Sequence, residues 1–299
     1  MSLTAQHPVR GALLILTGVF LFACMDTTIK YLTAFYPAPL VVAVRYIVHF
    51  LLMVVLLAPS QGRKLIQTQR TGLVLVRAAC LAAGSLAFAL ALKRMPVAEA
   101  SAILFVAPLL VLLVAGTFLR EKVGTFGWIA AITGFAGMLL IARPGGGLDA
   151  IGVVLALCAA ATTATYQLLS RVLASTESTI AMLFYTAIVG AICFGAVLPW
   201  FWTGPAPTPL QLLLFLTIGA LGGLGHFVFT AAHRHAPASA LAPLQYVQLL
   251  WAGLLGWAVF GHVPEGLSIL GMIVVAVAGA LVALKSRLAA RALEKAAQA

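Results

Sequence analysis

The sequence predicts an all-α membrane protein with ten transmembrane helices, arranged as two inverted five-helix repeats around a central cavity. Three observations lead to this fold class: the composition, the recurrence of long apolar runs, and a match of the sequence to itself at a fixed offset. Of 299 residues, 63% are hydrophobic and 8% are charged, whereas soluble proteins average roughly 45–50% apolar and about 25% charged residues. This composition is typical of a chain that lies mostly within a bilayer.

Apolar runs of about 18 to 24 residues recur over the whole length, and each can cross a hydrocarbon core of about 30 Å as a helix. The connections between them are short, so no soluble domain is expected. We expect ten spans, at 11–32, 38–58, 72–92, 97–119, 125–142, 150–170, 179–200, 210–231, 238–260 and 266–284.

A shift of 141 residues aligns the first four spans with the sixth to ninth spans without a gap. The matched positions include Gly11 with Gly152, Gly84 with Gly225, Phe88 with Phe229 and Pro96 with Pro237. We therefore expect two repeats, 11–142 and 150–284, followed by a basic cytoplasmic tail at 285–299. Because each repeat has five spans, the second enters the membrane from the opposite side. Inverted repeats of this kind enclose a midplane site in secondary transporters and provide alternating access.

The net charge of +11 is explained by topology and does not require a nucleic-acid partner. With the N-terminus in the cytoplasm, 12 Lys and Arg residues lie in inner segments and 4 in outer segments, as the positive-inside rule requires. Both termini are therefore expected in the cytoplasm, and the partners are the lipid bilayer and a small-molecule substrate. The four cysteines lie within spans without a CxxC pair, so no metal or other cofactor is expected.

The stretch from Ala98 to Leu140 resembles the repeat of the drug/metabolite transporter superfamily, EamA type. It reads AEASAILFVAPLLVLLVAGTFLREKVGTFGWIAAITGFAGMLL, with Pro108 inside the fourth helix, Glu121 at its end and a glycine-rich fifth helix. The resemblance covers about 11–284 and is greatest to bacterial amino-acid exporters of the YddG kind. It implies a cavity formed by the first four helices of each half, with helices five and ten outside it. The second half departs from the pattern, since His262 takes the register of Glu121 and Pro243 precedes that of Pro108.

Charged residues at membrane depth are costly unless they are paired or lie in a water-filled cavity. Asp26 is about 22 Å across the membrane from the start of its helix, and Arg45 is about 10 Å from the outer edge. We expect these two to pair, with Glu99 nearby at the start of helix four, in an outer gate. The alternatives are a pair of Asp26 with Lys30, or an unpaired Asp26 that carries a proton.

The repeat mates of the outer charges are neutral: Gln167 for Asp26, Thr186 for Arg45 and Ala240 for Glu99. The two gates are therefore expected to differ in strength. Arg77 lies about 8 Å from the inner surface, where we expect its long side chain to snorkel to the headgroups.

Aromatic and hydrogen-bonding residues on helices one to four and six to nine are candidates for the substrate cavity. Aromatic rings provide a stacking surface and amides or hydroxyls bind a polar end. The candidates are His49, Phe88, Phe105, Tyr166, Gln167, Tyr185, Phe229, Gln245, Tyr246 and Gln248.

These features predict a secondary transporter or facilitator of the bacterial inner membrane that moves small metabolites outward. Amino acids, including aromatic ones, are the expected substrates, and another small organic solute or a drug is the alternative. A membrane-embedded enzyme is the alternative of a different class, but no serine protease elbow is present, so the chain is not expected to be an enzyme. A monomer, or a weak homodimer through helices five and ten, is expected.

Overall fold

The computed structural model describes residues 8–94, 124–142 and 149–261. It also describes short pieces of the fourth and tenth predicted spans, at 100, 103–107, 110–111, 114, 266–267, 269–274, 277–278 and 281. Glu99, Pro108, Glu121, His262 and the tail at 285–299 lie outside the described residues.

The described part of the chain is helical and contains no strand, as the sequence predicts. Six of its helices are long and apolar enough to cross a membrane. Two shorter apolar helical stretches, Thr125–Gly137 and Leu244–Phe260, fall within α6 and within η2 and α11. The long helices are α1 (Pro8–Thr33), α2 (Ala38–Gln61), α3 (Thr71–Arg94), α7 (Ala150–Leu173), α8 (Thr179–Phe201) and α9 (Pro209–His235). The others are α6 (Thr125–Ala142), α10 (Ala238–Leu241) and α11 (Val247–Phe260), with 3₁₀ turns η1 (Gly62–Leu65) and η2 (Ala242–Tyr246).

The three long helices of the second half begin with side-chain caps that satisfy the first backbone N–H groups. Asp149 accepts a hydrogen bond from the N–H of Gly152 at the start of α7, and Ser178 accepts one from Ala181 at the start of α8. Thr208 and Gln211 form a reciprocal capping box at the start of α9. The local sequence therefore determines where these spans begin.

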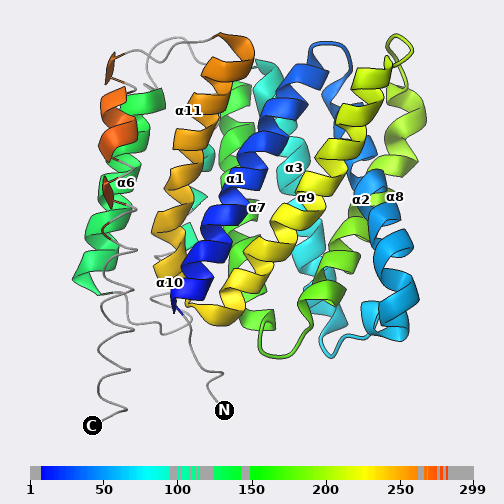
Figure 1. Cartoon of the computed structure of the whole chain (residues 1–299), viewed down its shortest axis with the longest axis horizontal. Helices are drawn as coiled ribbons and strands as arrows, with labels where there is room; N and C mark the ends of the chain where they lie inside the picture. Colours follow the sequence, from blue (N-terminus) through cyan, green and yellow to red (C-terminus); the bar gives the residue numbers. More distant parts are fainter. Residues whose placement is uncertain are drawn as a thin grey trace.

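Helix packing follows the two-fold relation that the repeat predicts. α1 packs along α9, and α3 packs along α7, which is the same contact with the halves exchanged. α2 packs against its own mate α8, and it contacts α9 as α8 contacts α3. Figure 1 shows the bundle with α6 at one edge and α2 and α8 at the other. The duplicated arrangement fits an inverted repeat.

Two glycines that are repeat mates lie at the α3–α7 and α1–α9 contacts and permit close approach there. A Cβ atom at Gly84 of α3 would lie 2.7 Å from Thr162 Oγ1 of α7, and a Cβ at Gly225 of α9 would lie 2.7 Å from Phe22 Cε1 of α1. Only glycine fits at these crossings without movement of the neighbour. Gly223 similarly makes room for His49 of α2. Small residues let membrane helices approach closely in this way.

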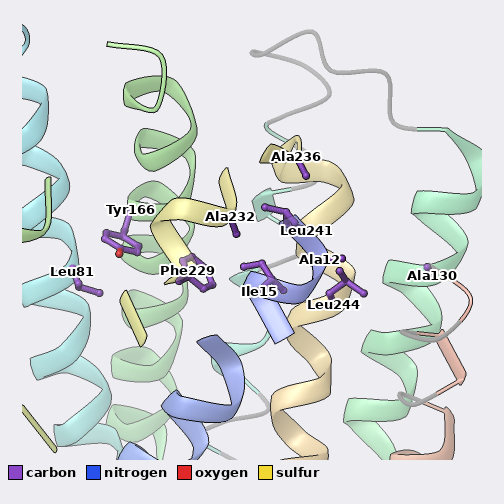
Figure 2. Packing of buried hydrophobic residues seen from close by; sticks show 10 residues of the cluster. All are labelled: Ala12, Ile15, Leu81, Ala130, Tyr166, Phe229, Ala232, Ala236, Leu241 and Leu244. Atoms are coloured by element: carbon purple, nitrogen blue, oxygen red, sulfur yellow. The ribbon is translucent and has the colours of Figure 1, made fainter. Parts of the chain in front are cut away.

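One end of the bundle, here called the basal end, contains the starts of α1 and α3 and the ends of α7 and α9. The distal end is the opposite one, where α1 and α3 end. A cluster of buried hydrophobic residues lies towards the basal end and joins α1, α9, α10 and η2 to single residues of α3, α6 and α7, and Figure 2 shows its members. A second cluster lies between α1, α2 and α9 near the distal end. The candidate site lies between these two regions.

Candidate functional site

A cavity of about 160 Å³ lies in the middle of the bundle, between helices of both halves. Its walls come from α1, α2 and α3 of the first half, from residues 104, 105 and 107, and from α7, α9, η2 and α11 of the second. The polar groups on these walls are Asp26, Arg45, Ser85, Thr163, Tyr166, Gln167, His226, Gln245 and Gln248. The remaining lining residues are apolar, four of them phenylalanines at 22, 88, 105 and 229.

The two charged residues of the cavity do not contact each other. Asp26 Oδ2 accepts a hydrogen bond from Gln248 Nε2 at 3.0 Å. Arg45 Nη2 donates to Ser85 Oγ at 2.9 Å, and the guanidinium carbon lies 4.5 Å from the centre of the Tyr46 ring. Within the described residues, the one ion pair closer than 4.0 Å joins Arg94 to Asp149 at the surface. The predicted direct pair of Asp26 with Arg45 is therefore wrong for this structure.

The alternative pair of Asp26 with Lys30 is absent as well. Lys30 Nζ lies 5.0 Å from the centre of the Phe260 ring, on the exposed side of α1. In both cases the reason is a neighbour from the second half. On α11, Gln248 binds Asp26 and Phe260 contacts Lys30. These residues are more than 200 positions apart in the sequence, so the sequence did not indicate the contacts.

An amide pair spans the cavity wall between α7 and η2. Gln167 and Gln245 exchange two hydrogen bonds, each 2.9 Å long. Gln245 reaches this place because the ninth span does not run as one helix: α10 ends at Leu241 and the 3₁₀ turn η2 follows, with proline at its start. Proline removes one backbone donor and interrupts a helix. Broken helices of this type line binding sites in transporters.

Arg77 lies next to the cavity on its basal side, which is here called the floor. It lies one helical turn before Leu81, the first lining residue of α3, and it is completely buried. Its five N–H donors bind five acceptors on three other helices: Ser170 Oγ at 2.7 Å, Tyr166 Oη at 3.0 Å, Met182 O at 3.1 Å, Thr186 Oγ1 at 3.0 Å and Thr230 Oγ1 at 2.8 Å. This Arg77 cluster contradicts the predicted snorkelling. The side chain turns inward because all five donors find acceptors there.

A group of aromatic rings packs between the Arg77 cluster and the rest of the cavity wall. Phe22 of α1 lies 4.7 Å from the His226 ring and 5.7 Å from the Phe229 ring, measured between centroids. Tyr166 Oη is 3.1 Å from His226 Nδ1 and also binds Arg77, so it belongs to both the cavity and the floor. The repeat mates Phe105 and Tyr246 lie 5.8 Å apart.

The model of the EamA-like transporter family matches residues 9–143 and again residues 150–284. This chain belongs to the EamA-like transporter family. It is thus a multi-pass membrane transporter of the drug/metabolite transporter superfamily, as its sequence predicts, and not an enzyme.

Relatives of this EamA-like transporter are named for several different substrates. A riboflavin transporter of Vibrio cholerae is 29% identical over 93% of this chain and 94% of its own. An S-adenosylmethionine uptake transporter of Rickettsia bellii is 27% identical over 72% of this chain and 73% of its own. The pseudopaline exporter CntI of Pseudomonas aeruginosa is 26% identical over 90% of this chain and 94% of its own. A solved crystal structure that is 19% identical has the same fold, with a TM-score of 0.77 over 93% of this chain and 97% of that chain.

Seven of the ten predicted cavity residues line the cavity of this transporter, together with Asp26 and Arg45. The seven are Phe88, Phe105, Tyr166, Gln167, Phe229, Gln245 and Gln248. Whether they touch a substrate stays a prediction.

The other three predicted cavity residues face elsewhere. His49 packs against Gly223, where a Cβ atom would lie 2.8 Å from its ring. Tyr185 donates a hydrogen bond to the carbonyl of Ile66 in a basal connection. Tyr246 packs over Gly134 of α6, where a Cβ would lie 2.6 Å from its ring. A helical position alone did not show which side of each helix faces the cavity.

The predicted site residues did not include Ser85 and His226 of the cavity, nor the buried carboxylate of Glu177 outside it. Ser85 and His226 share a repeat register and both line the cavity, but Ser85 binds Arg45 and Tyr46 while His226 binds Tyr166. Glu177, which is 2% exposed, accepts hydrogen bonds from the N–H groups of Gln69 and Arg70 in a basal connection. The one feature of the sequence that could have indicated Glu177 is that it is an acidic residue in the short connection between α7 and α8. The described residues hold no group of three His, Cys, Asp or Glu suited to a metal ion.

Proposed function

We propose that this EamA-like transporter is a secondary transporter that works by alternating access. It moves small organic metabolites outward across the bacterial inner membrane, with amino acids, including aromatic ones, as the first substrates to test. The observation that carries the proposal is the central cavity, which both halves line with aromatic rings and amide, hydroxyl and charged groups, and which the Arg77 cluster closes on its basal side.

The position of this closure supports alternating access. The Arg77 cluster joins α3 of one half to α7, α8 and α9 of the other, so it has to separate before the cavity can open to the basal end. If the two halves move against each other in this way, the site is exposed to one side of the membrane and then to the other, and the movement does not require ATP. The names of the relatives agree with an organic metabolite as substrate, and one is named for S-adenosylmethionine, a substituted amino acid.

The direction of transport needs a direct test, because the relatives include an uptake transporter and an exporter. The purified protein would be reconstituted into proteoliposomes loaded with one amino acid, and uptake of the same labelled amino acid would be followed by counterflow. We expect counterflow of at least one member of a panel that includes phenylalanine, tyrosine and tryptophan. A pH gradient of either sign then reports proton coupling and direction. No counterflow of any amino acid would overturn the amino-acid proposal, and a positive result with riboflavin instead would favour the alternative of another organic solute.

The topology proposal places both termini in the cytoplasm. It keeps the two repeats at 11–142 and 150–284, the basic tail at 285–299, and a monomer or weak homodimer through helices five and ten. In a cysteine-free background, Gln67→Cys should react with an impermeant maleimide only in inverted vesicles, and Thr203→Cys only in intact cells. Both positions are in connections, at opposite ends of the bundle. Labelling of the Thr203→Cys variant from the cytoplasmic side would reverse the orientation.

A further inference from the structure

Two opposite charges, Asp26 and Arg45, line one cavity without pairing, and Arg45 differs from the buried Arg77 in its hydrogen bonding. Arg77 uses all five of its donors on protein acceptors, so it has no capacity left for a ligand. Arg45 is also buried, with 6% exposure, but in the described part of the chain it makes one hydrogen bond to oxygen, one weak contact to sulfur and one contact with an aromatic ring.

The guanidinium of Arg45 is held in place but not saturated. Nη2 donates to Ser85 Oγ, which in turn lies 3.0 Å from Tyr46 Oη, and the guanidinium carbon lies 4.5 Å from the centre of the Tyr46 ring. Nη1 contacts only the sulfur of Met25 at 3.5 Å, and Nε is buried with no partner. A buried donor without an acceptor is unfavourable. An anionic group that enters the cavity would relieve this cost.

The carboxylate of Asp26 is the complementary group. It accepts a hydrogen bond from the neutral amide of Gln248, and no Lys, Arg or His nitrogen of the described chain lies within 4.0 Å of it. Asp26 comes from α1 and Arg45 from α2, and both line the same cavity. Phe22, Phe88, Phe105 and Phe229 provide the apolar remainder of its wall.

We propose that this cavity binds a zwitterionic amino acid between the two charges. The α-carboxylate binds Arg45 and Ser85, the α-ammonium group binds Asp26, and the side chain packs against the phenylalanines. The ligand thus takes the place of the ion pair that the two residues do not form. This proposal rests on the proposed function and names the chemical groups that its substrate must carry.

The site is expected to hold one amino acid in one orientation. The repeat mates of Asp26 and Arg45 are Gln167 and Thr186, and both are already engaged, Gln167 with Gln245 and Thr186 with Arg77. The second half therefore has no equivalent pair of charges. The pseudo-symmetry of the helices does not extend to the binding groups.

A binding experiment in detergent tests this inference without any need for transport. Three probes share the same ring and chain length: L-phenylalanine, 2-phenylethylamine, which lacks the carboxylate, and 3-phenylpropionate, which lacks the amine. We expect the wild-type protein to bind phenylalanine at least about tenfold more tightly than either probe with one charge, since a hydrogen bond to a charged group contributes about that much. Isothermal titration calorimetry measures the three constants.

Two variants should alter the preference in opposite directions. Arg45→Gln should abolish the advantage of phenylalanine over phenylethylamine, and Asp26→Asn should abolish its advantage over phenylpropionate. Arg45→Lys, which keeps the charge, should retain part of the preference and covers the case in which the glutamine variant fails to fold. Lys30→Gln is the matched control, because Lys30 lies one turn from Asp26 on the exposed side of α1, and it should bind as the wild type does.

The results separate this inference from the proposed function. Equal binding of all three probes, or an equal loss of all three in both variants, would overturn the zwitterion site. So would counterflow of some other solute by a protein that binds none of the probes, and that result would leave the transport proposal standing. An Asp26→Asn variant that keeps the preference for phenylalanine but loses pH-driven transport would assign Asp26 to a proton instead.

Discussion

Arg77 at the basal end and Ile218 at the distal end occupy the same place in the two repeats, 141 residues apart. Arg77 is surrounded by Tyr166, Ser170, Met182, Thr186 and Thr230, all bound to it through oxygen. The mates of the first three are Met25, Ile29 and Val41, and these pack with Ile218 in the distal apolar cluster. One helix arrangement is therefore closed by a saturated cation at one end and by hydrocarbon at the other.

A second pair of mates shows the same contrast. Glu177 at the basal end binds the N–H of Arg70 at 2.8 Å through its charged carboxylate. Its mate Tyr36 at the distal end donates to Oε1 of Gln211, the mate of Arg70, at 2.9 Å. The contact is conserved between the halves in position but not in charge. Polar closure depends on single side chains, whereas apolar packing is spread over many contacts.

The largest effect is expected for Arg77→Leu. Removal of the donor leaves several buried oxygens without their partner, and we expect a loss of about 3–5 kcal/mol of unfolding free energy. Arg94→Leu on the same helix is the control and should cost less than about 1 kcal/mol, since its ion pair with Asp149 is exposed. Chemical unfolding in detergent micelles measures both. Equal losses in the two variants would contradict the view that the Arg77 cluster stabilises the basal end more than an exposed ion pair does.

Glu177→Ala and Tyr36→Phe compare the two ends at one repeat register. Loss of the carboxylate should cost about 1.5–3 kcal/mol, because hydrogen bonds to a charged group are the stronger ones, and loss of the tyrosine hydroxyl about 0.5–1.5 kcal/mol. The same unfolding assay gives the two values. A larger loss for the Tyr36→Phe variant would contradict the view that the basal contacts are the stronger set.

Ile218→Val sharpens the comparison from the apolar side. It removes one methylene from a packed cluster, so a loss of about 0.5–1.5 kcal/mol is expected. Ile218→Leu preserves the volume and serves as its control. If the valine variant lost as much stability as Arg77→Leu, the distal cluster would not be the one that tolerates substitution better.

The smallest effect is expected from the coupling between Asp26 and Arg45. Since the two do not touch, the losses of Asp26→Asn and Arg45→Gln should add in the double variant, with a coupling energy of at most about 1 kcal/mol. A direct buried pair would instead make each single variant much worse than the double. A double-mutant cycle of unfolding free energies decides between them, and a strong coupling would restore the ion pair as an alternative state.

Six of the predicted spans are long helices in the described part of the chain. They could be predicted because they follow from composition and from residues that recur at a constant offset. The cavity walls were predicted in part. Phe88 and Phe229, which share a register, both line the cavity, whereas Phe105 lines it and its mate Tyr246 packs on α6. The break of the ninth span at η2 turns Tyr246 away, and the periodicity of a regular helix could not indicate that rotation.

The sequence by itself determined the membrane class of this EamA-like transporter, the approximate bounds of its six long helices and the duplication, since each depends on hydropathy or identity along one chain. Only the tertiary structure decided which buried arginine is saturated. Arg45 and Arg77 look alike in the sequence, each a single cation in an apolar run. Arg77 meets five acceptors from three distant helices, and Arg45 faces the cavity with donors to spare. Hydrogen bonds act over about 3 Å, so the fate of a buried charge depends on partners that only the folded chain brings together.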